Sequence, residues 1–465
     1  MEFRKLLIIG LDSAAPTLVF ERWREELPTL AGLIARGAHA RLRSSNPPIT
    51  VPAWTAMMSS RDPGELGFYG FRNRKDHSYD GYQFANSALV KVPRLWDWLG
   101  AYGMHCLVLG VPQTYPPSRI NGEMVSCFLT PSTKSEYTWP PSLKAEVESV
   151  TDGYVLDVEG FRTPDKAELL ERIYEKTRKH LTLAKHLMRT RQWDFCMLVE
   201  MGVDRIHHGF WSYVDPTHHK YEPGNPFERS ILDYYKYVDG ELAELLALCP
   251  RDTLVLVVSD HGAKKMDGGI CFNEWLIRQG YLTLAETPAK PTPIGKVAID
   301  WSKTVAWGDG GYYGRLFMNV RGREPSGVVD PADYETVRSE LIAGIEAITD
   351  PDGRNIGSKA FRPEDVYRTV NGVAPDLIVY FGDLDWRSVG TVGLGALYTF
   401  ENDTGPDEAN HDWHGIFILS TCGTGTQAPP LRGRLDDVSI YDVAPTLLRC
   451  LGRPVPEGLA GRALC

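Results

Sequence analysis

Acidic and histidine side chains stand at the ends of three apolar runs of strand length, and their types could bind metal ions. The residues concerned are Asp12, Asp204, Asp260 and His261. His208 follows Asp204 by four residues, so the two share a face if this segment is helical, while His207 points elsewhere. Carboxylate oxygens and imidazole nitrogens suit Zn²⁺ or Mn²⁺, and no thiolate of a structural zinc site accompanies them. We therefore expect a metal centre at these strand ends.

The segment NHDWHGIF, near the C-terminus, adds His411 and His414 directly before another apolar run. We expect both on a loop rather than in a core. Within so short a stretch only one of them is expected to face the site. With these additions the potential ligands number seven, which suggests two ions rather than one. Two neighbouring ions can clamp the attacking and leaving oxygens of an in-line displacement at phosphorus.

Residues 46–63, NPPITVPAWTAMMSSRDP, hold Thr50 between prolines where a polar loop becomes a helix-forming run. Alone, this pattern is explained by an ordinary helix N-cap. Beside the metal ligands it favours a nucleophile, because coordination to a divalent ion lets a hydroxyl attack as an alkoxide near neutral pH. The helix N-terminus would also offer N–H groups to a phosphoryl group.

Strand-length apolar runs alternate with helical stretches along the chain. The expected strands are 5–12, 105–112, 195–204, 252–262, 375–383 and 415–421. Helices are expected at 27–37, 163–190 and 230–248, with Thr163 as the N-cap of the second and Pro164 at its first position. This alternation predicts an α/β fold with a mainly parallel central sheet sandwiched by helices. Such sheets bind ligands beyond the carboxyl ends of their strands.

Two kinds of segment interrupt this pattern. We expect an α/β core of residues 1–262 and 371–465, with loop insertions at about 64–104 and 113–162, and an inserted cap at 263–370. These insertions are rich in aromatic residues, and stacking against a substrate is one use for them. The candidates are Phe68, Tyr69, Phe71, Trp139, Trp211, Trp301 and Trp307.

Composition limits the partners. The 465 residues carry a net charge of −10 without a basic run, which argues against a nucleic-acid duplex or an anionic membrane surface. No stretch of eighteen apolar residues predicts a spanning helix, and the N-terminal apolar run is too short for a signal sequence, so we expect a cytoplasmic protein. The eight cysteines lack metal-binding spacing and are expected to be reduced. The oligomeric state is left open.

In their order, GLD, PPITVPAWTAMMS, VDRIHHGFW, SDHG and NHDWHGIF resemble the alkaline phosphatase superfamily, in particular its type I phosphodiesterase and nucleotide pyrophosphatase branch. The resemblance covers nearly the whole chain and extends to a prokaryotic group of predicted phosphohydrolases or phosphomutases. It implies two divalent ions, Zn²⁺ foremost and Mn²⁺ as the alternative, and a nucleophile that is transiently phosphorylated. It places Asp12, Thr50, Asp260 and His261 around one ion, and Asp204, His208 and His411 around the other.

The leading prediction is thus a two-metal phosphodiesterase acting on a small-molecule phosphoester. A phosphomonoesterase or phosphomutase is the alternative, because monoesters need extra positive groups, for which Arg61, Arg205, Lys264 and Lys265 are candidates. His414 is expected on the substrate side. A sulfatase is disfavoured, since TVPAW offers no cysteine or serine for conversion to an aldehyde. A non-catalytic metal-binding scaffold is the alternative from another class.

Overall fold

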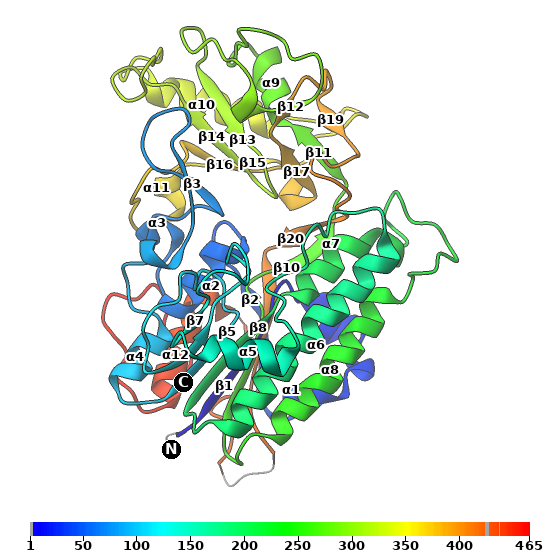
Figure 1. The fold of residues 1–465 in the computed structure, drawn as a ribbon. Coiled ribbons are helices and arrows are strands. Elements are labelled where there is room, and N and C mark those ends of the chain that lie inside the picture. Colours follow the sequence, from blue (N-terminus) through cyan, green and yellow to red (C-terminus); the bar gives the residue numbers. More distant parts are fainter. Residues whose placement is uncertain (1–2, 424–426, 437) are drawn as a thin grey trace.

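The computed structural model describes residues 3–423, 427–436 and 438–465, and it shows a large α/β lobe and a smaller cap lobe (Figure 1). One mixed sheet forms the centre of the α/β lobe. Its strands in spatial order are β22 (Gly433–Arg434), β2 (Ala38–Arg43), β21 (His414–Thr421), β9 (Leu254–Val258), β1 (Leu6–Leu11), β8 (Phe195–Glu200), β5 (Cys106–Leu109), β6 (Gly122–Val125) and β7 (Thr138–Trp139), and β23 (Val438–Ser439) also pairs with β2. The strands from β9 to β6 are parallel, whereas β21 is antiparallel to both its neighbours. The predicted sheet is confirmed.

Each face of this sheet has its own apolar core, because successive side chains of a strand point to opposite faces. Leu7 and Ile9 of β1 belong to one core, and Leu6 and Ile8 belong to the other. The first core is covered by α1 (Pro28–Arg36), α5 (Leu143–Thr151), α6 (Lys166–Thr190), α7 (Gly202–Val214) and α8 (Ser230–Ala247). The second is covered by α2 (Thr50–Ser59), α4 (Leu95–Ala101) and α12 (Val443–Cys450).

The cap lobe has a separate core and lies beyond the carboxyl ends of the parallel strands (Figure 1). Its main sheet is antiparallel, in the order β13 (Ala306–Asp309), β14 (Gly314–Met318), β16 (Leu377–Tyr380) and β15 (Lys359–Phe361). Smaller sheets join β17 (Trp386–Val389), β11 (Gly268–Cys271) and β19 (Tyr398–Thr399), and β12 (Thr292–Pro293) with β18 (Thr391–Val392). The cap helices are α9 (Phe272–Arg278), α10 (Tyr334–Glu346) and the short α11 (Pro363–Val366).

The chain enters the cap through β10 (Gly262–Lys265) and returns through β20 (Ala409–Asp412), and these two strands pair antiparallel. The expected cap boundary at residue 370 is therefore too early. The strands β16 to β19 pair inside the cap, and the run 375–383, expected in the central sheet, is one of them. Leu377, Val379 and Phe381 fill the cap core, whereas Ile378 and Tyr380 pack in a smaller cluster on the other face.

The two expected insertions also differ from the structure. Within 64–104, α3 (Pro63–Leu66) and the hairpin of β3 (Arg72–Arg74) and β4 (Tyr82–Phe84) reach the cap, where Tyr79 stacks on Trp301 with ring centroids 3.6 Å apart. The α4 helix, by contrast, belongs to the α/β core. Within 113–162, β6, β7 and α5 extend the α/β lobe.

The described residues include no helix that is long and apolar enough to cross a membrane. All eight cysteines are free thiols, and six of them are buried. Burial raises the pKa of Cys106 and Cys196 to about 12, so these thiols stay protonated.

Candidate active site

Two carboxylates meet where the adjacent strands β1 and β9 end. Asp12 and Asp260 are both fully buried. Trp54 of α2 donates its indole N–H to Asp12 Oδ2 over 2.6 Å, and the Ser13 N–H donates to Asp260 Oδ1 over 3.2 Å. Next to them, His261 Nε2 lies 3.2 Å from Asp260 Oδ2 and 3.8 Å from Asp12 Oδ1. The parallel register thus brings three potential metal ligands together at one edge of the sheet.

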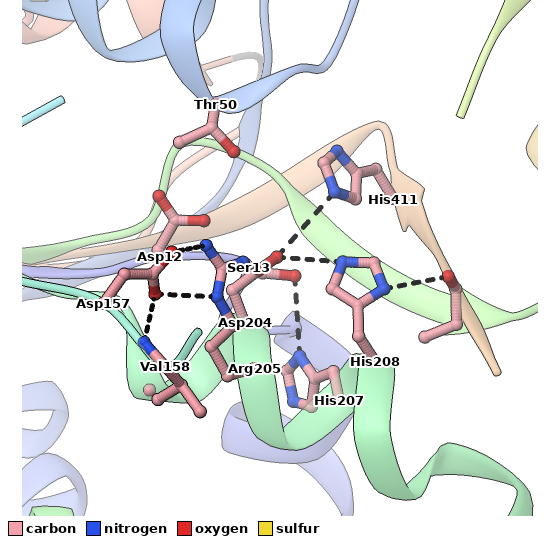
Figure 2. Close-up of polar contacts among 12 residues, drawn as sticks. Asp12, Ser13, Thr50, Asp157, Val158, Asp204, Arg205, His207, His208 and His411 are labelled. Atoms are coloured by element: carbon pink, nitrogen blue, oxygen red, sulfur yellow. Dashed lines mark hydrogen bonds and ion pairs between the residues drawn. The ribbon is translucent and has the colours of Figure 1, made fainter. Parts of the chain in front are cut away.

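The α7 helix supplies a second group. Asp204 Oδ1 lies 3.1 Å from His208 Nε2, one helical turn further along, as their four-residue spacing predicts. Arg205 pairs with the other oxygen of Asp204. His207 turns away, and its Nε2 lies 3.1 Å from the Tyr235 hydroxyl. Figure 2 shows Asp204 held between the guanidinium of Arg205 and the imidazoles of His208 and His411.

His411 lies between the two groups. Its ring stacks on that of His261 with centroids 3.7 Å apart, and its Nε2 lies 3.8 Å from Asp204 Oδ1. The expectation of a loop is wrong for this residue, because His411 stands within β20 and pairs with Ala263 of β10. His414 opens β21, where it is half-buried. The register of the two short strands therefore selects His411 as the histidine that faces the cluster.

The hydrogen bonds of the imidazoles show which nitrogen is free to bind a metal ion. His261 Nδ1 lies 3.0 Å from the Gly262 carbonyl and His411 Nδ1 lies 2.9 Å from the Pro48 carbonyl. A carbonyl only accepts, so Nδ1 is the protonated nitrogen and the lone pair of Nε2 faces the carboxylates. Two buried oxygens there, Asp12 Oδ1 and Asp260 Oδ2, accept no hydrogen bond from any residue that the structure describes, and Asp204 Oδ1 makes only ion-pair contacts with histidines. Lone pairs facing carboxylate oxygens repel unless a cation lies between them, so the donor set fits divalent metal ions.

The electrostatics of the cluster agree with this fit. Burial raises the pKa of Asp260 well above its ordinary value, and the charge of Asp12 adds to the shift. Asp12 is affected in the same way, by burial and by Asp204. Burial lowers the pKa of His261 to about 4 and keeps this ring neutral. Among the described residues, no lysine or arginine pairs with Asp12 or Asp260, so the ion-free cluster repels itself.

Two atom groups have the spacing of metal ligands, and they share one histidine. The first joins Asp12, Asp260 and His261, and the second joins Asp204, His261 and His411. The first contains three of the four residues expected around one ion, the fourth being Thr50. In the second, His261 takes the place expected for His208, whose Nε2 nevertheless lies within 3.1 Å of Asp204 Oδ1.

Asp407 contacts the site but was not predicted from the sequence. It is buried, and its Oδ1 lies 2.8 Å from His208 Nδ1. Its Oδ2 accepts from the Tyr312 hydroxyl and from Arg162 Nε, each over 2.8 Å. A carboxylate on the far nitrogen of a metal-binding histidine fixes the ring orientation. The sequence feature that could have indicated this role is the position of Asp407 four residues before His411.

Thr50 is the first residue of α2 rather than its N-cap. Ile49 holds the N-cap position with extended backbone, and no side chain caps this helix. The Thr50 side chain is therefore not used to satisfy the backbone. It is 3% exposed, and its Oγ1 lies 3.3 Å from His261 Nε2. The hydroxyl thus faces the cluster of carboxylates and imidazoles.

A cavity of about 310 Å³ opens beside Thr50, Asp204 and His411. Aromatic side chains and arginines from both lobes form most of its wall: Phe71, Phe128, Phe161, Tyr312, Tyr313, Arg72, Arg162, Arg205 and Arg315. Of the aromatic residues considered from the sequence, Phe71 lines this cavity. Trp301 and Trp307 pack around Tyr79 in the cap instead.

The expected substrate contacts lie outside the cavity, with one exception. Arg61 contacts Glu65 and the Gly458 carbonyl, and Lys264 pairs with Asp385 over 2.6 Å. Lys265 pairs with Asp267 over 2.6 Å. His414 is likewise absent from the lining, whereas Arg205 belongs to it.

Comparison with known proteins identifies the family. Residues 6–413 match the type I phosphodiesterase / nucleotide pyrophosphatase family. The chain belongs to this family. Membership makes it a phosphoester hydrolase of a metal-dependent class, as the geometry of the buried donors indicates. No protein of curated function matches the sequence.

Solved structures share the family fold at low identity. Human ectonucleotide pyrophosphatase/phosphodiesterase 5 is 12% identical, with a TM-score of 0.56, over 97% of this chain and 96% of its own. Phosphonoacetate hydrolase from Sinorhizobium meliloti, in complex with phosphonoacetate, is 14% identical with a TM-score of 0.61 and the same coverage. An inactive threonine-to-alanine variant of the murine ectonucleotide enzyme, in complex with AMP, is 11% identical with a TM-score of 0.56 over the same shares.

Proposed function

We propose that this family member is a two-metal phosphodiesterase in which Thr50 attacks phosphorus. The observation that carries the proposal is the Thr50 hydroxyl, which is buried, serves no cap, and lies 3.3 Å from His261 Nε2 at the mouth of the donor cluster. The inactive threonine-to-alanine variant of the murine neighbour is consistent with this role. Asp12, Asp260 and His261 would hold one ion with Thr50, and Asp204, His208 and His411 would hold the other.

Bound divalent ions would supply positive charge that lowers the pKa of an oxygen nucleophile and stabilises the phosphoryl oxygens. The residues of the chain do the positioning. Thr50 Oγ1 loses its proton to solvent and forms a bond to phosphorus, while the ester oxygen leaves with its electron pair and takes up a proton from water. A water molecule then attacks phosphorus and gives up a proton, and the Oγ1–phosphorus bond breaks to restore the Thr50 hydroxyl. In His261 and His411 the proton is on Nδ1, so the lone pair of each Nε2 points toward the carboxylates. Asp407 holds the ring of His208.

The cavity favours diesters over monoesters. A diester carries a second organic group, and the aromatic wall beside Thr50 offers room for one. A monoester needs extra cations around its non-bridging oxygens, yet Arg61, Lys264 and Lys265, three of the four candidates predicted from the sequence, are engaged elsewhere. Arg72 also lines the cavity, but it belongs to the hairpin that reaches the cap. Arg205, which does line the cavity, is already paired with Asp157 and Asp204.

The test compares bis(4-nitrophenyl) phosphate with 4-nitrophenyl phosphate on protein reconstituted with Zn²⁺ or Mn²⁺. We expect a higher kcat/KM for the diester, and Thr50→Ala should remove nearly all of it, whereas Thr50→Ser should retain part. Thr55→Ala is the matched control, because Thr55 lies on the same helix and is equally buried but donates to Gln113. Faster turnover of the monoester would favour the phosphatase or mutase alternative, and full activity of Thr50→Ala would exclude Thr50 as nucleophile.

A further inference from the structure

Four residues on the cap side of the cavity form a group that the proposed reaction does not use. This cap-side cluster consists of Gly70, Arg72, Tyr313 and Arg315. Gly70 precedes β3, whose first residue is Arg72, while Tyr313 directly precedes β14 and Arg315 is the second residue of that strand. Arg315 donates to the backbone carbonyl of Arg72 and so joins the two segments.

Tyr313 carries a buried hydroxyl without a partner. Its side chain is 5% exposed, lines the cavity, and makes no hydrogen bond with any residue that the structure describes. Leaving such a group unpaired in a protein interior costs free energy, so an unsatisfied hydroxyl calls for an explanation. Burial raises the pKa of Tyr313 to about 12, which keeps it a donor at neutral pH. The O–H of Tyr313 therefore lacks an acceptor among the described residues.

Arg72 carries a positive charge without a partner. The other three arginines of the cavity are paired with carboxylates: Arg162 with Asp407, Arg205 with Asp157 and Asp204, and Arg315 with Asp309. No ion pair or side-chain hydrogen bond of Arg72 occurs within residues 3–423, 427–436 and 438–465. Arg72 is the exposed first residue of β3, and its guanidinium is the uncompensated charge of a cavity wall that also holds the Tyr313 hydroxyl.

Gly70 keeps the space at this place open. A Cβ at residue 70 would lie 3.1 Å from the Tyr313 hydroxyl and 3.6 Å from Arg315 Nη1. Any larger side chain would therefore fill the space in front of both donors. Gly70 thus leaves a small recess in the cavity wall in front of the Tyr313 hydroxyl and of Arg315, whose own charge is paired with Asp309.

We propose that the cap-side cluster binds a second anionic group, a carboxylate or a phosphate, carried by the substrate away from the phosphorus that Thr50 attacks. Tyr313 donates its O–H to this group, and Arg72 donates N–H bonds and the opposite charge. The substrate class is then a small phosphodiester with one further oxyanion. The inference rests on the proposed function, because it takes the cavity beside Thr50 as the substrate site.

Measurements of ligand affinity test this proposal without the need for catalysis. The dissociation constants of diphenyl phosphate and of its mono-4-carboxy and mono-4-carbamoyl derivatives are measured calorimetrically on Zn²⁺-loaded Thr50→Ala protein. The carbamoyl compound matches the carboxylate in shape and lacks its charge. We expect the carboxylate to bind about tenfold or more tightly than the amide, as for charge-assisted hydrogen bonds. A derivative with a 4-phosphate group shows which oxyanion is preferred.

Matched variants assign the effect to the cluster. Arg72→Ala and Tyr313→Phe, each added to Thr50→Ala, should bring the carboxylate-to-amide ratio close to one. Lys75→Ala and Tyr367→Phe should leave it unchanged. Lys75 is an exposed cation next to the same hairpin, and Tyr367 is another buried tyrosine whose hydroxyl lacks a partner, but neither lines the cavity.

Equal affinity for the carboxylate and the amide would overturn the inference, as would a preference that survives both cluster variants. Failure of the proposed function has a different signature. In that case the metal-loaded wild type turns over no diester, while the binding preference for the carboxylate can still be read.

Discussion

Replacing Asp260 by asparagine should stabilise the ion-free protein and abolish the stabilisation that metal ions give. Asp260 Oδ2 is buried without a hydrogen-bond partner, 3.2 Å from the unprotonated Nε2 of His261. An amide at this position could donate to that nitrogen, and its oxygen could still accept from the Ser13 N–H. The substitution therefore exchanges a repulsive contact for a hydrogen bond, but it removes a ligand from the metal centre.

The expected magnitude follows from the contact that changes. Relief of one unsatisfied buried acceptor is worth about 1–3 kcal/mol. Unfolding entropy of about 2.1 cal/mol/K per residue makes 1 kcal/mol equal to roughly 1 °C in a cooperative chain of this length. In excess chelator, Asp260→Asn should thus raise Tm by about 1–3 °C relative to the wild type. With Zn²⁺ added, the wild type should gain stability and the variant should gain much less.

The raised pKa of Asp260 determines in which direction pH changes the stability difference between the variant and the wild type. Its folded pKa lies above the ordinary value of 3.8 because of burial and the charge of Asp12. The protonated carboxyl of Asp260 therefore contributes its full stabilisation of the folded state below pH 3.8. That stabilisation is lost as the pH rises through the pKa of Asp260 in the folded protein. The ion-free variant should therefore exceed the wild type by more at about pH 8 than at about pH 5.

A satisfied buried carboxylate provides the control. Asp239 accepts from the Thr29 and Leu30 N–H groups, each over 2.9 Å, at the N-terminus of α1. Asp239→Asn loses one of these acceptors and should be destabilised by about 1–2 kcal/mol in chelator. The reasoning is refuted if Asp260→Asn lowers Tm in chelator as the control does, or if it gains as much stability from Zn²⁺ as the wild type.

Three further outcomes are expected. His411→Ala should lose one ion and nearly all turnover, while His414→Ala should keep both ions with altered kinetics, and metal analysis of the two purified variants decides between them. Chelation should abolish diester hydrolysis and Zn²⁺ or Mn²⁺ should restore it, with Asp204→Ala retaining about one ion fewer than wild type; full activity after exhaustive chelation contradicts this. Metal binding should release protons, and metal affinity should increase as the pH rises, because burial holds the pKa values of Asp12 and Asp260 above their ordinary range. Calorimetry in buffers of different ionisation enthalpy measures the number of protons released.

The parts of the fold predicted from the sequence are those where a single local pattern decides. Continuous apolar runs mark strands buried on both faces, and β1, β5, β8, β9 and β21 all follow this rule. The same pattern cannot tell which sheet a strand joins, and β16 reads like a central strand although it pairs with β14 and β15. Short strands such as β6 and β7 have too few residues to show a strand pattern, so the sequence predicts an insertion where they lie.

Competing caps explain a smaller difference, at the start of α6. Both Thr163 and Asp165 could cap a helix. Thr163 Oγ1 accepts from the Asp165 N–H, while the Asp165 side chain accepts from the Glu168 N–H. The helix therefore begins at Lys166, two residues later than predicted. Propensity alone does not rank two good caps in succession, and the hydrogen bonds of the folded chain decide.

The metal centre and the substrate cavity differ in how far sequence can predict them. Ligands are drawn from a few residue types, and the carboxyl ends of parallel strands bring them together, so Asp12, Asp204 and Asp260 stand out along the chain. Arginine and tyrosine serve many purposes, and only tertiary contacts show which charge or hydroxyl is left unpaired. Arg162 and Arg72 look alike in sequence, but Asp407 neutralises the first and no described residue neutralises the second. We therefore expect substrate preference in this protein to depend on the groups that the fold leaves unsatisfied around the cavity, and the sequence does not show which groups those are.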